Sequence, residues 1–206
     1  MEINGITIKG KAPELVGKFS GPLMVLGSGK RVFDDIETCV SAFNKAGLKF
    51  HTMAANLSFL AWDGPIEHLV SLHQNKLPHF YELSEDLPVS RVGFKTYAHC
   101  TFPTPMEKYT EWPIVDNNGT SSLLALKVAV MLGYEKIVCC GMDLEGTHRF
   151  YDNPNLKTTN NFSCDAIFYS WNQIAKHNEH FRTKVRGTSG RVAELFGKVS
   201  QEWLEA

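Results

Sequence analysis

The chain has 206 residues, of which 43% are hydrophobic, and its formal charge is −1 with the histidines neutral. This length and this apolar share are sufficient for a buried core and are typical of one domain. A charge so close to zero provides no general basic field, so we expect no nucleic acid as a partner. No run of about 18 apolar residues occurs, so we also expect no membrane span.

The 5 cysteines are scattered, at positions 39, 100, 139, 140 and 164, and no two of them form a CxxC pair. This usage indicates a reduced, cytoplasmic protein and favours neither a disulfide framework nor a zinc site. The first residues also lack the basic and then apolar pattern of a signal peptide.

In chain order, strand-like and helix-like segments alternate. The stretch INGITIKG, within residues 1–20, predicts a short strand or hairpin. Apolar runs of strand length follow at 22–27, 49–55, 67–72, 92–98, 136–142 and, more weakly, 183–187. Helical patterns cover 32–46, 121–132 and 166–177, with one or two further helices within 190–204.

The segment 121–132 gives the clearest helix prediction. Its sequence, SSLLALKVAVML, is apolar on every side apart from Lys127, and Gly133 follows as a stop signal. A helix of this kind is buried, so we expect it to pack against the sheet.

This alternation predicts an α/β fold with a Rossmann-like, mainly parallel sheet of five to six strands and helices on both faces, because parallel strands need long crossovers. We expect a single domain over residues 1–206, in which 1–20 form an N-terminal extension. The segments 101–118 and 147–161 have no clear periodicity and are predicted to be long loops.

Polar residues follow the predicted strands where each strand ends. Gly27 to Lys30, Asn56, His73 and Asp143 all occupy such positions. The carboxyl ends of parallel strands line one edge of a sheet, where ligands of such folds bind, so the pattern favours a shared crevice. The alternative is that loops are polar wherever they occur.

The corner after the first long strand, LMVLGSGKRVF, matches neither common phosphate-binding motif. A Walker motif needs glycine at position 24 and Ser or Thr at 31, and the dinucleotide fingerprint needs glycine at 32, where the chain has Met, Arg and Val. Two interpretations stay open. Gly27 and Gly29 admit a phosphate to the backbone beside Ser28 and Lys30, or they only form a tight corner.

A second candidate lies at the start of the buried helix, in the stretch NNGTSS. Gly119 leaves room for a ligand, and the hydroxyls of Thr120, Ser121 and Ser122 can bond phosphate or ribose at the helix N-terminus. The alternative is an ordinary helix cap.

The stretch GMDLEGTHRFYD, which follows the strand at 136–142, carries the remaining candidates. Asp143 either holds its own loop or positions a metal or substrate. His148 and His73 are candidates for proton transfer, and Arg149 for stabilising a leaving phosphate. Tyr151 can stack on a base or cover the edge of the sheet.

Residues 119–146, GTSSLLALKVAVMLGYEKIVCCGMDLEG, resemble the hydroxyl-rich turn, apolar helix, strand and G-x-D segment of 6-hydroxymethylpterin diphosphokinase-like proteins and of the bacterial sialyltransferases related to them in fold. VLGSGKRV is similar to their N-terminal glycine loop, although Lys-Arg replaces Pro-Ser, and Asn56 matches an asparagine at the end of their second strand. The resemblance implies a nucleotide across the strand ends, held by Gly27, Ser28, Gly29, Asn56 and the turn from Thr120 to Ser122.

The leading prediction is a nucleotide-dependent transferase, diphosphokinase-like or glycosyltransferase-like, with an undefined acceptor. Its nucleotide, of the ATP or CMP type, would lie against the residues above together with Lys30 and Gly119. Asp143, His148 and His73 are the catalytic candidates, and Asp143 is the candidate ligand for Mg²⁺ if a metal takes part. The alternative is a non-catalytic nucleotide-binding or protein-interaction module on the same fold.

Overall fold

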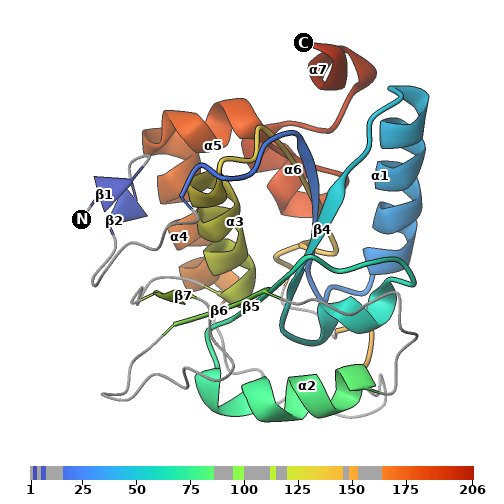
Figure 1. Cartoon of the computed structure of the whole chain (residues 1–206). Helices are drawn as coiled ribbons and strands as arrows, with labels where there is room; N and C mark the ends of the chain where they lie inside the picture. Colours follow the sequence, from blue (N-terminus) through green and yellow to red (C-terminus); the bar gives the residue numbers. More distant parts are fainter. Residues whose placement is uncertain are drawn as a thin grey trace.

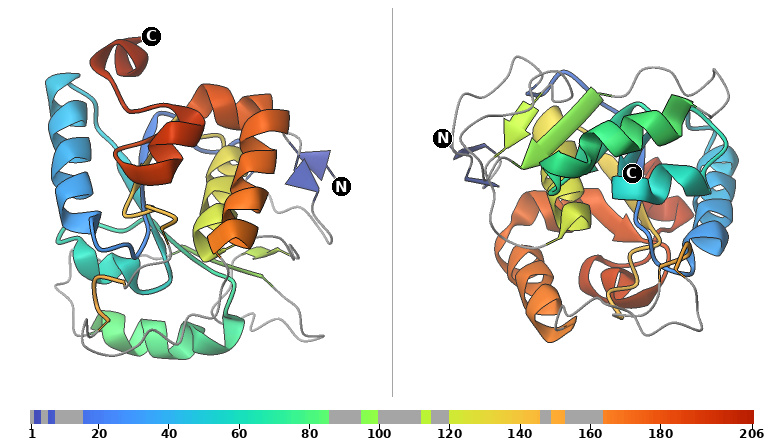
Figure 2. Two further views of the ribbon diagram at one scale, coloured as in Figure 1. Left: turned by 180° about the vertical axis from the view of Figure 1, so that it is seen from behind. Right: turned by 90° about the horizontal axis from the view of Figure 1, so that it is seen from below.

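The computed structural model describes residues 2–3, 6–7, 16–85, 95–99, 112–114, 120–145, 149–152 and 164–206. Within these ranges, an α/β fold is built on one parallel sheet with helices packed on both of its faces, as the alternating pattern predicts (Figure 1). Figure 2 shows the same layers from behind, with α1 on one side of the strands and α3 and α4 on the other.

The described part of the sheet has seven strands in the order β7-β6-β5-β4-β3-β8-β9. Every neighbouring pair in it is parallel. The strands are β3 (Pro22–Leu26), β4 (His51–Ala55), β5 (His68–Ser71), β6 (Lys95–His99), β7 (Trp112–Ile114), β8 (Lys136–Cys140) and β9 (Val185–Gly187). The sheet is therefore wider than the expected five to six strands, because β7 lies within the segment 101–118 that was predicted to be a loop.

Two short strands precede the main fold. β1 (Glu2–Ile3) and β2 (Ile6–Thr7) pair antiparallel, which agrees with the predicted strand or hairpin.

The helices lie between the strands or after them. They are α1 (Val32–Lys45), α2 (Leu77–Glu85), α3 (Ser121–Leu132), α4 (Cys164–His177), α5 (Glu179–Lys184), α6 (Gly190–Phe196) and α7 (Gln201–Glu205), with 3-10 turns η1 (Asn56–Ala61) and η2 (Gln74–Lys76). α1, α3 and α4 agree with the predicted helices, and α6 and α7 with the one or two expected within 190–204, whereas α2 and α5 are additional. None of the helices in the described ranges has both the length and the apolar character that crossing a membrane requires.

The strands separate two hydrophobic cores, because successive side chains of a strand point to opposite faces of a sheet. Leu23, Val25 and Met53 pack with α3 and with Trp171, Phe181 and Phe196 from α4 to α6. On the other face, Met24, Leu26 and Ala54 pack with the buried residues of α1 and with Phe59 and Phe80. Both faces of the central strands are therefore dry, which explains their nearly continuous apolar sequences.

α3 is the most deeply buried helix, as its sequence predicts. Thr120 caps its first turn by accepting a hydrogen bond from the amide of Leu123, and Gly133 ends it in the left-handed conformation at φ 105°. Eleven of its residues are buried, Lys127 among them. Since α3 runs antiparallel to the strands, its N-terminus lies at the carboxyl edge of the sheet and its C-terminus at the amino edge.

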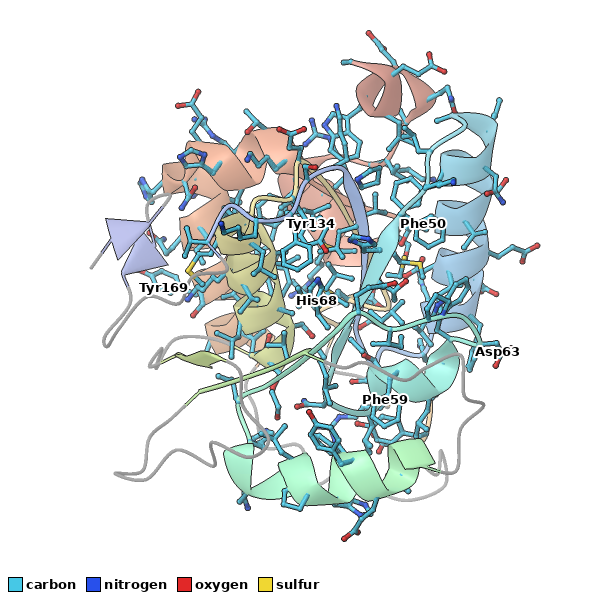
Figure 3. The ribbon with its side chains drawn as sticks, viewed as in Figure 1. Phe50, Phe59, Asp63, His68, Tyr134 and Tyr169 are labelled. Carbon is cyan, nitrogen blue, oxygen red and sulfur yellow. The ribbon has the colours of Figure 1, made fainter. Side chains whose placement is uncertain are left out.

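A buried polar cluster closes the amino edge of the sheet. The hydroxyl of Tyr134 lies 2.8 Å from Nδ1 of His51 and 2.7 Å from Nε2 of His68. The ring of Phe19 stacks on Tyr134, with 5.5 Å between the ring centroids. Figure 3 shows Tyr134 and His68 beside each other between α3 and β4. This cluster joins the starts of β4 and β5 to the end of α3.

Candidate functional site at the carboxyl edge of the sheet

The strand order creates a switch point beside the central strand β3. From β3 the chain builds β4 to β7 on one side, and it then crosses over to build β8 and β9 on the other. Ligands of open α/β sheets bind outside the carboxyl ends of the strands at such a point. The residues that follow β3 and β8 therefore meet at the candidate site.

The glycine corner is packed directly against the end of β8. The amide of Gly27 donates to the carbonyl of Cys140 at 2.7 Å, and that of Gly29 to the carbonyl of Gly141 at 2.8 Å. A β-carbon on Gly27 would collide with the Gly141 carbonyl, and one on Gly29 would lie 2.9 Å from Oδ2 of Asp143. Close packing within the protein thus accounts for both glycines, and their amides are already bonded, which supports the tight-corner interpretation.

Next to this corner, α1 begins without a side-chain cap. Its N-cap residue is Arg31, whose side chain makes no cap bond, and the first helical amide, that of Val32, donates to the carbonyl of Gly29 at 3.1 Å. Lys30 and Arg31 are exposed there. Asp35, in the same turn, is buried and accepts a bond of 2.8 Å from the amide of Gly141, so it fixes the end of β8. A helix start without a side-chain cap, together with the two cations, makes this place favourable for an anion.

Asn56 is linked to the end of the next strand, β5. The hydroxyl of Ser71 donates to Oδ1 of Asn56 at 2.7 Å, and it accepts a bond of 2.9 Å from the amide of His73. Asn56 has a φ of 55°, a left-handed conformation that asparagine tolerates better than most residues. The structure thus places Asn56 and His73 together, as the shared-crevice prediction requires.

The start of α3 joins this group through Ser121. Its hydroxyl accepts a bond of 3.1 Å from the amide of Leu72, immediately after β5. Thr120 serves as the helix cap, so one of its lone pairs is used within the protein, and Ser122 is half-buried beside it. Gly119 lies outside the described residues. The corner at Ser28 follows β3, and the start of α3 is bonded to the end of β5, so both lie at the same edge of the sheet. Only β4 separates these two strands, which places β3 and β5 about 10 Å apart.

Asp143 is the buried acid at the switch point. Its side chain is 7% exposed, and no hydrogen-bond partner of Oδ2 is present in the described part of the chain. Burial raises the pKa of Asp143, and the nearby Glu145 carboxylate raises it further, whereas the Glu145 amide, Lys30 and Arg31 lower it. A buried carboxylate oxygen without a partner is costly in a folded protein.

The backbone beside Asp143 is also unusual. Leu144 has a φ of 55°, which is strained for a branched side chain. Strained residues concentrate at functional sites. Together with the unpartnered oxygen, this strain makes Asp143 the strongest functional candidate of those that the sequence suggested.

His73 lies exposed at the edge of the site. Partial burial lowers its pKa, and the charges of Lys76 and Arg149 lower it further. Its imidazole is therefore neutral near pH 7 and able to accept a proton. The second histidine candidate, His148, lies outside the described residues.

The described segment Arg149 to Asp152 lies against the glycine corner. The amide of Phe150 donates to the carbonyl of Ser28 at 3.0 Å, and Gly29 and Arg149 form an antiparallel bridge. Arg149 is thereby placed close enough to His73 to affect its pKa. Arg149 therefore lies at the same edge of the sheet as His73 and the glycine corner.

Two serines at the site carry no motif and were not found from the sequence. Ser71 connects Asn56 to His73, as described above. Ser189, at the start of α6, has a buried hydroxyl with no partner among the described residues, and the next residue but one, Arg191, donates its amide to the Asp143 carbonyl at 3.3 Å. Ser189 could have been found from the sequence, because Ser189 and Gly190 stand at the start of a predicted helix. The start of α3 has the same combination of glycine and hydroxyl side chains.

A metal at this site would have few protein ligands. Within the described ranges, no three or more His, Cys, Asp or Glu side chains are grouped so that they could hold an ion. The free oxygen of Asp143 fits one position of a Mg²⁺ ion, whose remaining ligands are commonly water and substrate phosphate.

A scan against protein-family models and searches of curated proteins and of solved structures found no match to this chain.

Proposed function

We propose that the chain binds a nucleotide at the carboxyl edge of its sheet and acts as a nucleotide-dependent transferase. The observation that carries this proposal is the buried Oδ2 of Asp143, which has no hydrogen-bond partner among the described residues and lies at the switch point beside the uncapped start of α1. The family resemblance of residues 119–146 supports the same class of ligand.

The binding half of the proposal assigns the phosphates to the start of α1. The open first turn of this helix, Lys30 and Arg31 provide the positive potential. Asn56 and Ser122 contribute hydrogen bonds from the adjacent strand and helix. Gly27 and Gly29 shape the site but donate little to it, because their amides are already bonded within the protein, whereas Thr120 accepts the cap bond and keeps its hydroxyl proton as a donor.

The chemical half assigns a proton transfer to His73 or His148. The acceptor hydroxyl gives its proton to the imidazole, and its oxygen attacks either the β-phosphorus of a nucleoside triphosphate or the anomeric carbon of a CMP-sugar. The bond to the nucleotide breaks, and a nucleoside monophosphate leaves in both cases. Arg149 stabilises its negative charge. Mg²⁺, when bound by Asp143, would neutralise phosphate charge.

The second candidate is a binding module without chemistry on the same site. It is favoured by the internal use of the Gly27 and Gly29 amides, which leaves fewer donors for a reacting phosphate. We also propose a cytoplasmic, reducing location, since Cys39, Cys139 and Cys140 are buried free thiols.

The test is a thermal-shift screen with ATP, CTP, CMP and CMP-sugars, each with and without MgCl₂, followed by assays for release of AMP or CMP. We expect stabilisation by at least one nucleotide, and a weaker shift in Lys30→Gln. Lys45→Gln is the matched control, because Lys45 is exposed in the last turn of the same helix. Binding without turnover would select the module, and no stabilisation by any nucleotide would refute both candidates.

A further inference from the structure

Three aromatic side chains form a cluster beside the glycine corner. Phe33 projects from the first turn of α1, and Phe150 and Tyr151 come from the segment after β8. The rings of Phe33 and Phe150 meet edge to face with 5.5 Å between centroids, and those of Phe150 and Tyr151 with 4.9 Å. We call these three residues the aromatic cluster.

This cluster exposes ring surface to solvent. Phe33 is 55% exposed and Tyr151 36%, which makes them two of the few large hydrophobic side chains exposed in the described part of the chain. Phe150 packs partly against the core below and supports the other two rings. An exposed phenylalanine gains little for folding, since its transfer from water is incomplete. Its position therefore favours a role in contacting another molecule.

The surroundings of the cluster favour a planar ligand that carries negative charge. The guanidinium of Arg149 lies 5.7 Å from the Tyr151 ring centroid, and Lys30 and Arg31 precede Phe33 in the chain. Of the neighbouring acids, Asp35 is bonded to the Gly141 amide and Asp152 accepts from the Arg149 amide. Asp34 is exposed beside Phe33 and is the opposing charge at this surface.

The cluster is also tied to the proposed phosphate position. The amide of Phe150 is bonded to the carbonyl of Ser28, in the corner that leads into α1, and Phe33 belongs to the first turn of that helix. A nucleotide with its phosphates at this helix start could therefore place its base against the rings without any change of the fold.

We propose that the aromatic cluster is the base-binding surface of the nucleotide site, with Phe33 and Tyr151 stacking on the heterocycle. This inference rests on the proposed function, and it adds the position of the base. Stacking on aromatic rings tolerates different bases, so the cluster holds purines and pyrimidines alike.

The test compares ligands with and without a base. Affinities of ATP, CTP and inorganic tripolyphosphate are measured by calorimetry for the unmodified chain, Phe33→Leu and Tyr151→Leu. We expect each variant to lose about tenfold in affinity for both nucleotides and to bind tripolyphosphate unchanged. Tyr169→Leu is the matched control, since Tyr169 is 63% exposed on α4 and lies on the opposite side of the molecule from α1 (Figure 3).

The outcomes separate the two proposals. If nucleotides bind the unmodified chain and both variants equally well, the base lies elsewhere. The proposed role of the aromatic cluster is then wrong, whereas the proposal of a nucleotide site is kept. If tripolyphosphate binding falls together with nucleotide binding, the rings support the helix start and do not stack on a base. If the unmodified chain binds no nucleotide, both proposals fail.

Discussion

Gly29 faces Asp143 so closely that a β-carbon at position 29 would lie 2.9 Å from the Asp143 Oδ2 atom and equally close to the Gly141 carbonyl. Gly29→Ala is therefore expected to displace the Asp143 carboxylate and to lower the free energy of unfolding by roughly 1–3 kcal/mol, as overpacking does. Urea denaturation measures this loss. Ser28→Ala, one residue earlier, is the control and should remain within about 0.5 kcal/mol. Equal stability of both variants would contradict the close packing.

Asp143→Asn tests the cost of the buried carboxylate. A pKa that is raised on folding means that Asp143 contributes stability below its unfolded pKa, and that this contribution is lost as the pH rises through its folded pKa. At pH 7 the uncharged Asn side chain avoids this loss, so the variant should melt at a higher temperature than the unmodified chain. The difference should shrink as the pH falls toward 3.8, the ordinary pKa of aspartate. Melting curves between pH 3 and 8 measure it.

The same variant separates stability from function. If Asp143 positions Mg²⁺ and phosphate, Asp143→Asn should be more stable without ligand, yet show no additional thermal shift from MgCl₂ in the presence of nucleotide. A variant that is less stable at every pH would instead show that the Asp143 carboxylate holds its own loop.

His73 should titrate below 6.5, its ordinary pKa. Because the folded pKa is depressed, the stability that His73 contributes is fully present above the unfolded pKa and is lost as the pH falls through the folded one. An NMR titration of the imidazole protons measures the midpoint. Burial is the largest cause, followed by Lys76 and then Arg149, so Lys76→Gln should raise the pKa more than Arg149→Gln. A midpoint at or above 6.5 would contradict the lowering of the His73 pKa by burial and by the two cations.

Tyr134→Phe tests the polar cluster at the opposite edge. The change removes the hydroxyl that bonds the buried His68 and the half-buried His51, so we expect a loss of roughly 1–3 kcal/mol in the free energy of unfolding. Tyr169→Phe, at an exposed position, should have no effect. Nucleotide affinity of the folded Tyr134→Phe protein should not change, because this cluster lies at the amino edge. A loss of affinity would indicate coupling between the two edges.

The arrangement of strands and buried helices follows closely from local sequence patterns. The central strands are dry on both faces, which makes their sequences continuous apolar runs, and α3 is apolar all round. β7 was missed because its sequence, WPI, contains a proline. Proline has no N–H to donate to a neighbouring strand. It is tolerated in β7 because β7 is the outermost strand in the described part of the sheet and has a neighbour on one side only. α2 was missed because Pro78 interrupts a short pattern, although proline is accepted in the first turn of a helix.

The site was less accessible from the sequence, because its contacts join distant positions. The choice between a phosphate loop and a tight corner at Gly27 and Gly29 depends on how β3 and β8 align, and their residues are more than a hundred positions apart. No local pattern records that alignment. Asn56 and Asp143 could be selected because each directly follows a predicted strand, whereas Ser71 and Ser189 acquire their significance only from neighbours in space.

The pairing of β3 with β8 also constrains the order of assembly. Pro22 aligns with Lys136, whereas the other edge of β3 pairs with β4, which begins at His51. During synthesis, one edge of β3 stays unpaired until more than a hundred further residues have left the ribosome. An unpaired strand edge can pair with another chain and so favours association. A nascent chain arrested before Lys136 should therefore be unable to complete the sheet and should keep one edge of β3 open to association.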